Sequence, residues 1–244
     1  MKGKAFHHHR FYCPPESIAR DLVRFPEDES VHITASLRLG VGDIVTATDG
    51  AGRIYEIRLE EASGREVVGK ILKVTSVAPA RRSVWVFQGI VRPARMDLVI
   101  EKCVELGVAG FVAVRGERSV RRVADSRPER WKRIAIEAIK QSLQAYLPEM
   151  SAPQTFGAAL EAARRLDMIL VASEEGGASL AQVLKYRKPD RIGLWVGPEG
   201  GFAHDEAEAL RAAGAVTFSL GASRLRSETA TLASLALIHG LFSD

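Results

Sequence analysis

Two glycine-bearing loops near the end of the 244-residue chain carry the residue types best suited to holding a ligand. The first loop, 197–201, follows an apolar run of strand character at 192–196, and the second, 221–227, follows a similar run at 216–220. A helical pattern begins directly after each loop. Glycine lets a ligand approach the backbone, and a helix start offers unpaired N–H groups to polar ligand atoms. We therefore expect the two loops to form one pocket.

The spacing of the glycines argues against two common classes of nucleotide-binding loop. The run from Gly197 to Gly201 matches neither G-x-G-x-x-G nor G-x-x-x-x-G-K-[ST], so neither the dinucleotide nor the P-loop fingerprint is present. A tight strand-to-helix turn without a ligand would also explain one such loop. The second loop in the same arrangement favours a pocket.

Charge is unevenly placed along the chain. The net charge is +4, but residues 115–133 contain eight basic residues against three acidic ones, a difference of +5. Such a segment could neutralise several phosphates of a nucleic acid, although a solvated helix face would show the same charge.

Composition places the chain among globular proteins, with 46% hydrophobic and 26% charged residues. No apolar run is long enough to span a bilayer, and the first residues lack the apolar core of a signal peptide, so we expect a cytoplasmic protein. Cys13 and Cys103 form no C-x-x-C pattern and are expected to be free thiols. The three histidines at 7–9 lack nearby partners, so we expect no metal site.

The pattern of elements changes near Pro79. Before it, strands at 44–48, 55–60 and 67–77 with tight turns between them predict a meander that could close into a small barrel. After it, strands at 84–90, 108–114 and 168–172 alternate with helical patterns, which predicts a mainly parallel sheet covered on both faces. We therefore expect two domains, residues 1–78 and residues 79–244.

Several motifs together resemble those of a known family. They are Gly197-Pro198-Glu199-Gly200-Gly201-Phe202, Ser219-Leu220-Gly221, Leu225-Arg226-Ser227-Glu228-Thr229-Ala230 and, nearer the N-terminus, Leu37-Arg38-Leu39 with Gly42-Asp43. They are similar to the motifs of the SPOUT class of RNA methyltransferases, and most similar to the bacterial 16S ribosomal RNA uracil-N3 methyltransferase family. The resemblance covers nearly the whole chain. It departs at residues 143–146, where the family more often has a Gly-Arg continuation, and at Ser227, where threonine is more usual.

This resemblance implies a fold, an activity and partners. The fold would be a PUA-like, RNA-binding β-barrel followed by an α/β SPOUT domain with a deep trefoil knot. The activity would be S-adenosyl-L-methionine-dependent methylation of uracil N3 at a specific uridine of 16S rRNA in the small ribosomal subunit, and the target base must be single-stranded or flipped. The active form would be a homodimer. The contact would use the apolar C-terminal helix, with Leu232, Leu235, Ala236, Ile238 and His239.

The resemblance also assigns candidate roles to residues. Glu228 would accept a proton or bind the cofactor amine, although an acid in the first turn of a helix also complements the helix dipole. Arg226 would stabilise the developing enolate or contact a partner. The cofactor would be held by Gly197, Pro198, Glu199, Gly200, Gly201, Leu220, Gly221, Leu225, Arg226, Thr229 and Ala230. The RNA would be held by other segments, through Arg10, Arg38, Arg95, Arg118 and Arg121.

Alternatives in other functional classes remain open at this stage. A SPOUT enzyme could act on another RNA site. A noncatalytic RNA-binding protein would need the barrel and the basic segment but neither glycine loop. A nucleotide-dependent oxidoreductase would require a dinucleotide fingerprint, which the chain lacks.

Overall fold

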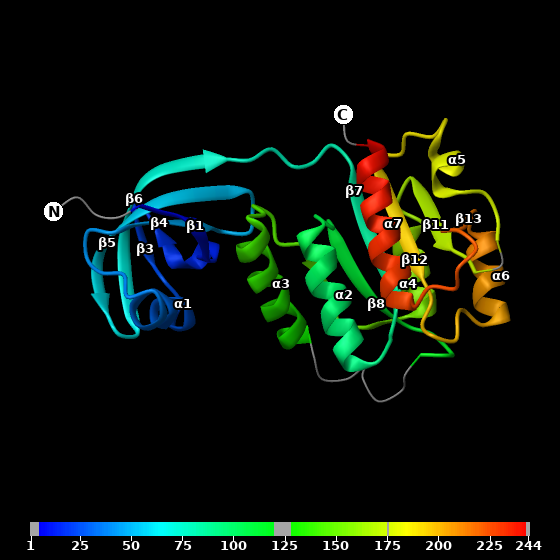
Figure 1. The fold of residues 1–244 in the computed structure, drawn as a ribbon, viewed down its shortest axis with the longest axis horizontal. Helices are drawn as coiled ribbons and strands as arrows, with labels where there is room; N and C mark the ends of the chain where they lie inside the picture. The colour runs from blue at the N-terminus through cyan, green and yellow to red at the C-terminus, as the bar shows by residue number, and fades with distance from the viewer. Residues whose placement is uncertain (1–4, 120–127, 175, 243–244) are drawn as a thin grey trace. The chain divides into compact units, whose positions relative to one another are not determined.

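Two compact units make up the chain in the computed structural model (Figure 1). The structure describes residues 5–119, 128–174 and 176–242. The first unit contains Met1–Pro79 and Ile136–Leu147, and the second contains Ala80–Ala135 and Pro148–Asp244. Each unit has its own hydrophobic core.

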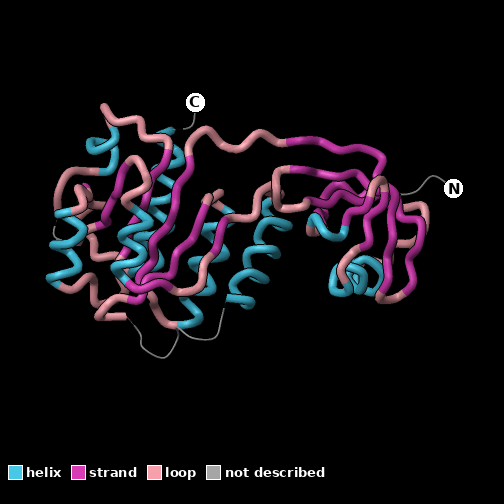
Figure 2. Tube along the Cα trace, turned by 180° about the vertical axis from the view of Figure 1, so that it is seen from behind, coloured by secondary structure: helices cyan, strands magenta, loops and turns pink. Residues whose placement is uncertain are grey.

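A curled six-stranded sheet forms the first unit, with strand order β1-β4-β5-β6-β3-β2 (Figure 2). β4, β5 and β6 pair as the predicted antiparallel meander, and β1 joins β4 in parallel. Phe11, Ile33 and Ile57 are buried in its core, on the inner face of this half-barrel. Its elements are β1 Ala5–Tyr12, a 3-10 turn Pro15–Ser17, β2 Ile18–Ala19, β3 Leu22–Arg24, α1 Glu27–Val31, a π-helical turn His32–Ser36, β4 Ile44–Thr48, β5 Arg53–Ser63 and β6 Glu66–Ser76.

The segment 136–147 packs with this barrel although it lies more than fifty residues further along the chain. Ala145 O accepts hydrogen bonds from Gly52 N at 3.0 Å and from Thr48 Oγ1 at 3.2 Å. Leu147 N donates to Gly50 O at 2.8 Å. Backbone groups thus tie the segment to the turn between β4 and β5. The predicted boundary at residue 78 did not include this segment.

The second unit contains a seven-stranded sheet in which every strand pair is parallel. Its order is β10-β8-β7-β12-β11-β13, with β9 also beside β8. This confirms the predicted α/β architecture. The strands are β7 Ser83–Gly89, β8 Gly110–Arg115, β9 Glu149–Met150, β10 Gln154–Thr155, β11 Met168–Ala172, β12 Arg191–Val196 and β13 Val216–Phe218. The helices are α2 Pro93–Glu105, α4 Phe156–Ala163, α5 Leu180–Leu184, α6 His204–Ala212 and α7 Ser227–Phe242. A further helix, α3 Pro128–Ser142, begins in this unit, and its residues from Ile136 on belong to the first unit.

Helices cover this sheet on both faces. Phe87 and Trp195 stack at 4.8 Å between ring centroids and pack with residues of α4 and α6. α7 packs beside α2 and against β7 and β12, in front of the sheet in Figure 1. The chain therefore returns from β13 at one edge to the middle of the sheet. The trefoil knot itself stays a prediction.

Two sequence expectations concern thiols and membranes. Cys13 and Cys103 are both free, as predicted, and both are buried, and burial raises the pKa of Cys13 to about 12. Among the described residues, no helix is long and apolar enough to cross a membrane.

Candidate active site

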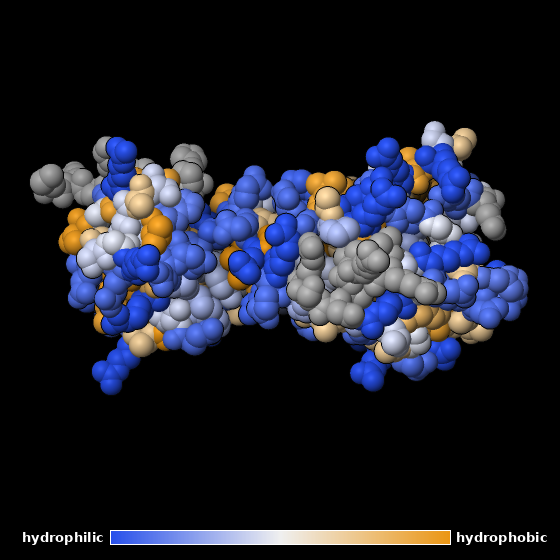
Figure 3. Space-filling model, turned by 90° about the horizontal axis from the view of Figure 1, so that it is seen from below, coloured by the Kyte–Doolittle hydropathy of each residue, from blue (hydrophilic) through white to orange (hydrophobic). Residues whose placement is uncertain are grey.

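Three neighbouring strands deliver their following loops to one edge of the parallel sheet. β11 lies between β12 and β13, so the loops after all three meet at the carboxyl edge, where open α/β sheets usually bind ligands. A cavity of about 700 Å³ lies there, between residues 171–174, 196–211 and 217–230. Its volume falls in the range of small-molecule sites. In the view from below, hydrophilic residues predominate on the coloured surface, with smaller hydrophobic areas between them (Figure 3).

The cavity collects most of the predicted cofactor residues. Those that line it are Gly197, Pro198, Glu199, Gly200, Gly201, Leu220, Gly221, Leu225, Arg226 and Ala230. Thr229 and Glu228 are not among its lining residues. The loop after β11 also lines it, through Ser173 and Glu174, which the sequence interpretation missed. The position of β11 between the two predicted strands depends on the tertiary structure, so no local motif indicated that its loop lines the cavity.

Close backbone approaches explain the glycines of the first loop. Gly201 N donates to Pro198 O at 2.9 Å, and Gly201 adopts φ +68°, a conformation that favours glycine. A Cβ on Gly197 would lie 3.1 Å from Gly201 Cα. A Cβ on Gly89, at the end of β7, would lie 2.6 Å from Pro198 N. Gly89 was not predicted as a site residue, yet its lack of a side chain lets the loop rest on β7.

A buried chain of hydrogen bonds joins β7, the first loop and the start of α7. Gln88, which is fully buried, donates from Nε2 to Ser227 Oγ at 2.9 Å. Ser227 Oγ donates to Gly197 O at 2.5 Å, and Thr231 Oγ1 donates to Gln88 Oε1 at 2.5 Å. We call Gln88, Ser227, Thr231 and the Gly197 carbonyl the Gln88 cluster. The hydroxyl at position 227 thus joins the first loop to β7, and serine supplies it where the resembling family more often has threonine.

Arg95 links two carboxylates beside the cavity. Its Nη1 lies 3.2 Å from Glu199 Oε1, and its Nε lies 3.5 Å from Glu228 Oε1. Glu228 is only 8% exposed, and its Oε2 is buried without a hydrogen-bond partner among the described residues. The structure thus brings a predicted RNA-binding residue next to the predicted catalytic acid.

Comparisons with known proteins agree with this geometry. Residues 78–239 match the RNA methyltransferase domain family, and residues 25–72 match the RNA methyltransferase PUA domain family. The ribosomal RNA small subunit methyltransferase E of Mycobacterium bovis is 31% identical over 224 residues, which cover 88% of this chain and 85% of the relative. The chain belongs to the ribosomal RNA small subunit methyltransferase E family. The Synechocystis member is 29% identical over 97% of this chain and 78% of its own.

Two similar solved structures contain the expected cofactor. A structure from Neisseria gonorrhoeae bound to S-adenosyl methionine is 30% identical, with a TM-score of 0.86 over 96% of this chain and 98% of that one. A Legionella pneumophila methyltransferase in complex with the same cofactor is 25% identical, with a TM-score of 0.85 over 96% and 98%. The SPOUT fold of the second unit is thereby established. The 700 Å³ cavity and the bare backbone of loop 197–201 fit such a cofactor.

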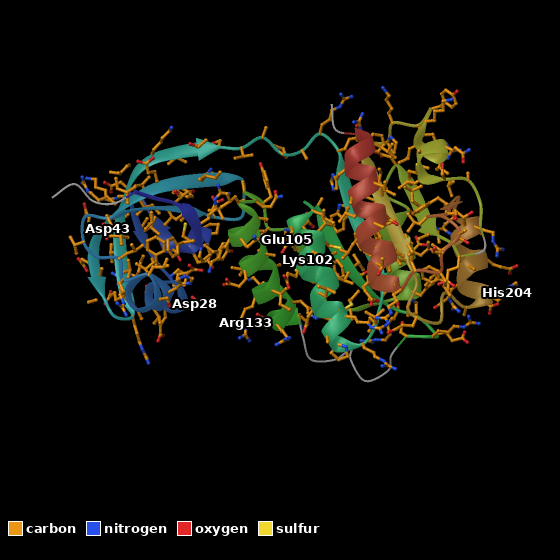
Figure 4. All side chains as sticks on the ribbon, viewed as in Figure 1. Asp28, Asp43, Lys102, Glu105, Arg133 and His204 are labelled. Carbon is orange, nitrogen blue, oxygen red and sulfur yellow. The ribbon has the colours of Figure 1, made fainter. Side chains whose placement is uncertain are left out.

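Arg118, a predicted RNA-binding residue, belongs to the wall of the cavity. Its Nη1 donates to Gly200 O at 2.9 Å. Glu206 of α6 joins the segment after β8 to the start of α6, because its Oε1 accepts from Glu117 N and its Oε2 from Ala203 N, both at 2.9 Å. Arg118 thus lies beside the predicted cofactor loop, and its contact with RNA stays a prediction. His204, labelled in Figure 4 on α6, also lines the cavity.

The other predicted RNA-binding arginines have different surroundings. Arg10 donates from Nη1 to the carbonyl of Leu143 and, at 3.3 Å, to that of Gln144, and burial lowers its pKa. Arg38 is exposed with φ +54°. Arg121 lies outside the described residues, as does the stretch 120–127 of the basic segment. No group of metal-binding side chains occurs within the described ranges.

Proposed function

We propose that the protein methylates N3 of a specific uridine of 16S rRNA in the small ribosomal subunit, with S-adenosyl-L-methionine as donor. The observation that carries this proposal is the cavity between the two glycine loops, in a chain of the small subunit methyltransferase E family. A cytoplasmic location follows from this substrate. The first unit, with Arg10 and Arg38, is proposed to contact the RNA.

The chain's own residues would bind, orient and accept the proton. The cofactor supplies a methyl group that its sulfonium already activates, so the protein mainly provides geometry and a base. Backbone groups of loops 197–201 and 220–221 would hold the donor. Arg226, which is exposed and lines the cavity, would stabilise negative charge on the uracil oxygens.

Glu228 is the proposed proton acceptor. Arg95 pairs with its Oε1, and its buried Oε2 has no hydrogen-bond partner among the described residues, so RNA binding would have to open a path to this oxygen. Glu228→Gln should lower kcat with little effect on cofactor affinity if Oε2 takes the N3 proton. A loss of cofactor affinity with unchanged kcat would instead assign Glu228 to the cofactor amine.

A homodimer is the second part of the proposal. Leu235 and Ile238, two of the predicted contact residues, are buried within the chain itself. The exposed apolar residues of this region are Leu237 and Leu241 on α7 and Leu98 on the neighbouring α2, with 49%, 45% and 41% exposure. Sedimentation should give twice 26.6 kDa, and Leu237→Lys with Leu241→Lys should give the monomer.

One experiment tests the reaction. Small subunits from a strain that lacks the activity are incubated with the protein and the methyl donor, and the modified nucleoside is identified by mass spectrometry. We expect 3-methyluridine at one position of 16S rRNA. A different methylated nucleoside would indicate a SPOUT enzyme of other specificity. RNA binding without any methyl transfer would indicate a noncatalytic protein.

A further inference from the structure

The opposite edge of the parallel sheet carries a second concentration of positive charge. β7 and β12 both begin there, and the residues just before them are Arg81 and the run Lys185, Tyr186, Arg187 and Lys188. All five are exposed. Ser83 N donates to Asp190 O at 2.8 Å, which places the two segments side by side. We call these five residues the amino-edge patch.

Acidic neighbours pair with only one residue of this patch, Arg81, among the described residues. Asp190 is the one acid in residues 185–191, and its carboxylate lies 3.9 Å from Arg81. Asp167 is bonded to Arg191 at 2.6 Å. In the part of the chain that the structure describes, no carboxylate forms an ion pair with Lys185, Arg187 or Lys188. Three cations thus remain available to an anionic partner.

Tyr186 stands out among the exposed side chains of the second unit. It is 85% exposed, and Lys185 Nζ lies 5.1 Å from its ring centroid. A ring with so little contact to the protein contributes little to the core. An aromatic ring flanked by cations is the arrangement that binds single-stranded nucleic acid, because a base can stack on the ring while the cations neutralise phosphates.

We propose that the amino-edge patch binds a single-stranded segment of ribosomal RNA other than the one that carries the target uridine. β12 runs from the patch at Arg191 to the cofactor loop after Val196, a distance of roughly 20 Å for its six residues. The base that receives the methyl group cannot reach the patch. The patch would therefore add affinity for the assembled subunit, and this rests on the proposed RNA substrate.

Binding of the full-length protein to small ribosomal subunits, measured over a range of salt concentrations, tests the proposal. The combined variant Lys185→Ala, Arg187→Ala and Lys188→Ala should reduce the slope of log K against log salt by about 2, since each phosphate of a single strand contributes about 0.7. Tyr186→Ala should weaken binding about fivefold or more, whereas Tyr186→Phe keeps the ring and should bind normally.

A matched control distinguishes the loss of a positive charge anywhere on the protein from the loss of one in the patch. Lys102 of α2, labelled in Figure 4, is paired with Glu101 and Glu105 at 2.7 and 2.6 Å. Lys102→Ala and Lys188→Ala each remove one positive charge, but only Lys188→Ala should flatten the salt slope. Cofactor affinity, measured by calorimetry, should stay unchanged in all patch variants.

Two outcomes would overturn the proposal. One is an unchanged slope and affinity in the combined variant. The other is dissociation of a dimer in that variant, which would show that the patch binds protein. Failure of the proposed reaction would be seen separately, because the wild-type protein would then transfer no methyl group whatever the patch variants do in the binding assay.

Discussion

Two buried polar clusters join segments that are distant in the sequence, and they do so with opposite chemistry. At the cofactor edge, the Gln88 cluster contains only neutral groups. In the first unit, Lys140 Nζ lies 2.6 Å from Glu29 Oε1, and both side chains are at least nine-tenths buried. Glu29 Oε2 has no partner among the described residues. The contribution of the neutral cluster should therefore not depend on pH, whereas the contribution of the Glu29–Lys140 pair to the free energy of unfolding should depend on it.

We expect the largest effect on stability when one partner of this ion pair is removed. Lys140→Ala leaves Glu29 buried without its cation, which should lower the free energy of unfolding by about 3 kcal/mol at pH 8. This free energy is measured by unfolding in denaturant. The double variant Lys140→Met with Glu29→Leu removes both charges and should lie within about 1 kcal/mol of the wild type. Equal destabilisation by the single and double variants would contradict the ionic account.

The pH dependence of stability distinguishes the two clusters next. Burial raises the pKa of Glu29 from 4.5 to about 7, against the opposing effect of Lys140. The folded chain then binds a proton that the unfolded chain has released, so the free energy of unfolding should fall as pH rises from 4.5 to 7, by on the order of 2 kcal/mol. Lys140 stays charged throughout this window. Glu29→Gln should flatten the profile, and an unaltered profile would exclude Glu29 as its source.

The cofactor edge can be disturbed sterically without removing a polar group. Gly89→Ala places a methyl group 2.5 Å from Pro198 Cδ and 2.6 Å from Pro198 N, so loop 197–201 must move. We expect a loss of about 2 kcal/mol, or about 30-fold in cofactor affinity. Gly157→Ala, where a new Cβ meets nothing within 4 Å, is the control. Calorimetry that gives both variants wild-type affinity would show that this loop does not hold the donor.

Removing the neutral cluster should have a smaller effect. Gln88→Ala leaves Thr231 Oγ1 without its side-chain acceptor and Ser227 Oγ without a donor. We expect cofactor affinity to fall about tenfold, equally at pH 6 and pH 8. Ser227→Thr retains the hydroxyl and should change affinity less than about twofold. A pH-dependent loss in Gln88→Ala would contradict the contrast between the clusters.

The smallest effect concerns the segment that carries Lys140. Leu143 follows α3 with φ +60°, a left-handed conformation that costs a non-glycine residue about 1 kcal/mol, and its carbonyl accepts from Arg10. Leu143→Gly should stabilise the protein by roughly 0.5 kcal/mol, measured by thermal unfolding. Ser142→Gly, inside the helix, should do the reverse.

Local patterns in the sequence were sufficient for the elements and for part of the site. Alternation in 55–60 and the helical spacing of Met96, Val99 and Ile100 correspond to β5 and α2, because periodicity records which face of an element is buried. The two glycine loops were identifiable because glycine is needed where backbone approaches backbone. Their common place at one edge followed from the parallel sheet.

Contacts between distant segments were decided only by the tertiary structure. In the sequence, Gly89 is only the end of a predicted strand, and its close approach to Pro198 is visible only in the structure. Arg118 is likewise only one residue of a basic segment, and the structure shows its hydrogen bond to Gly200 O. Likewise, nothing near Lys140 in the sequence indicates Glu29 as its partner, 111 residues away. Such pairs leave no periodic or motif signal, because each residue's environment is supplied by chain that arrives from elsewhere in the fold.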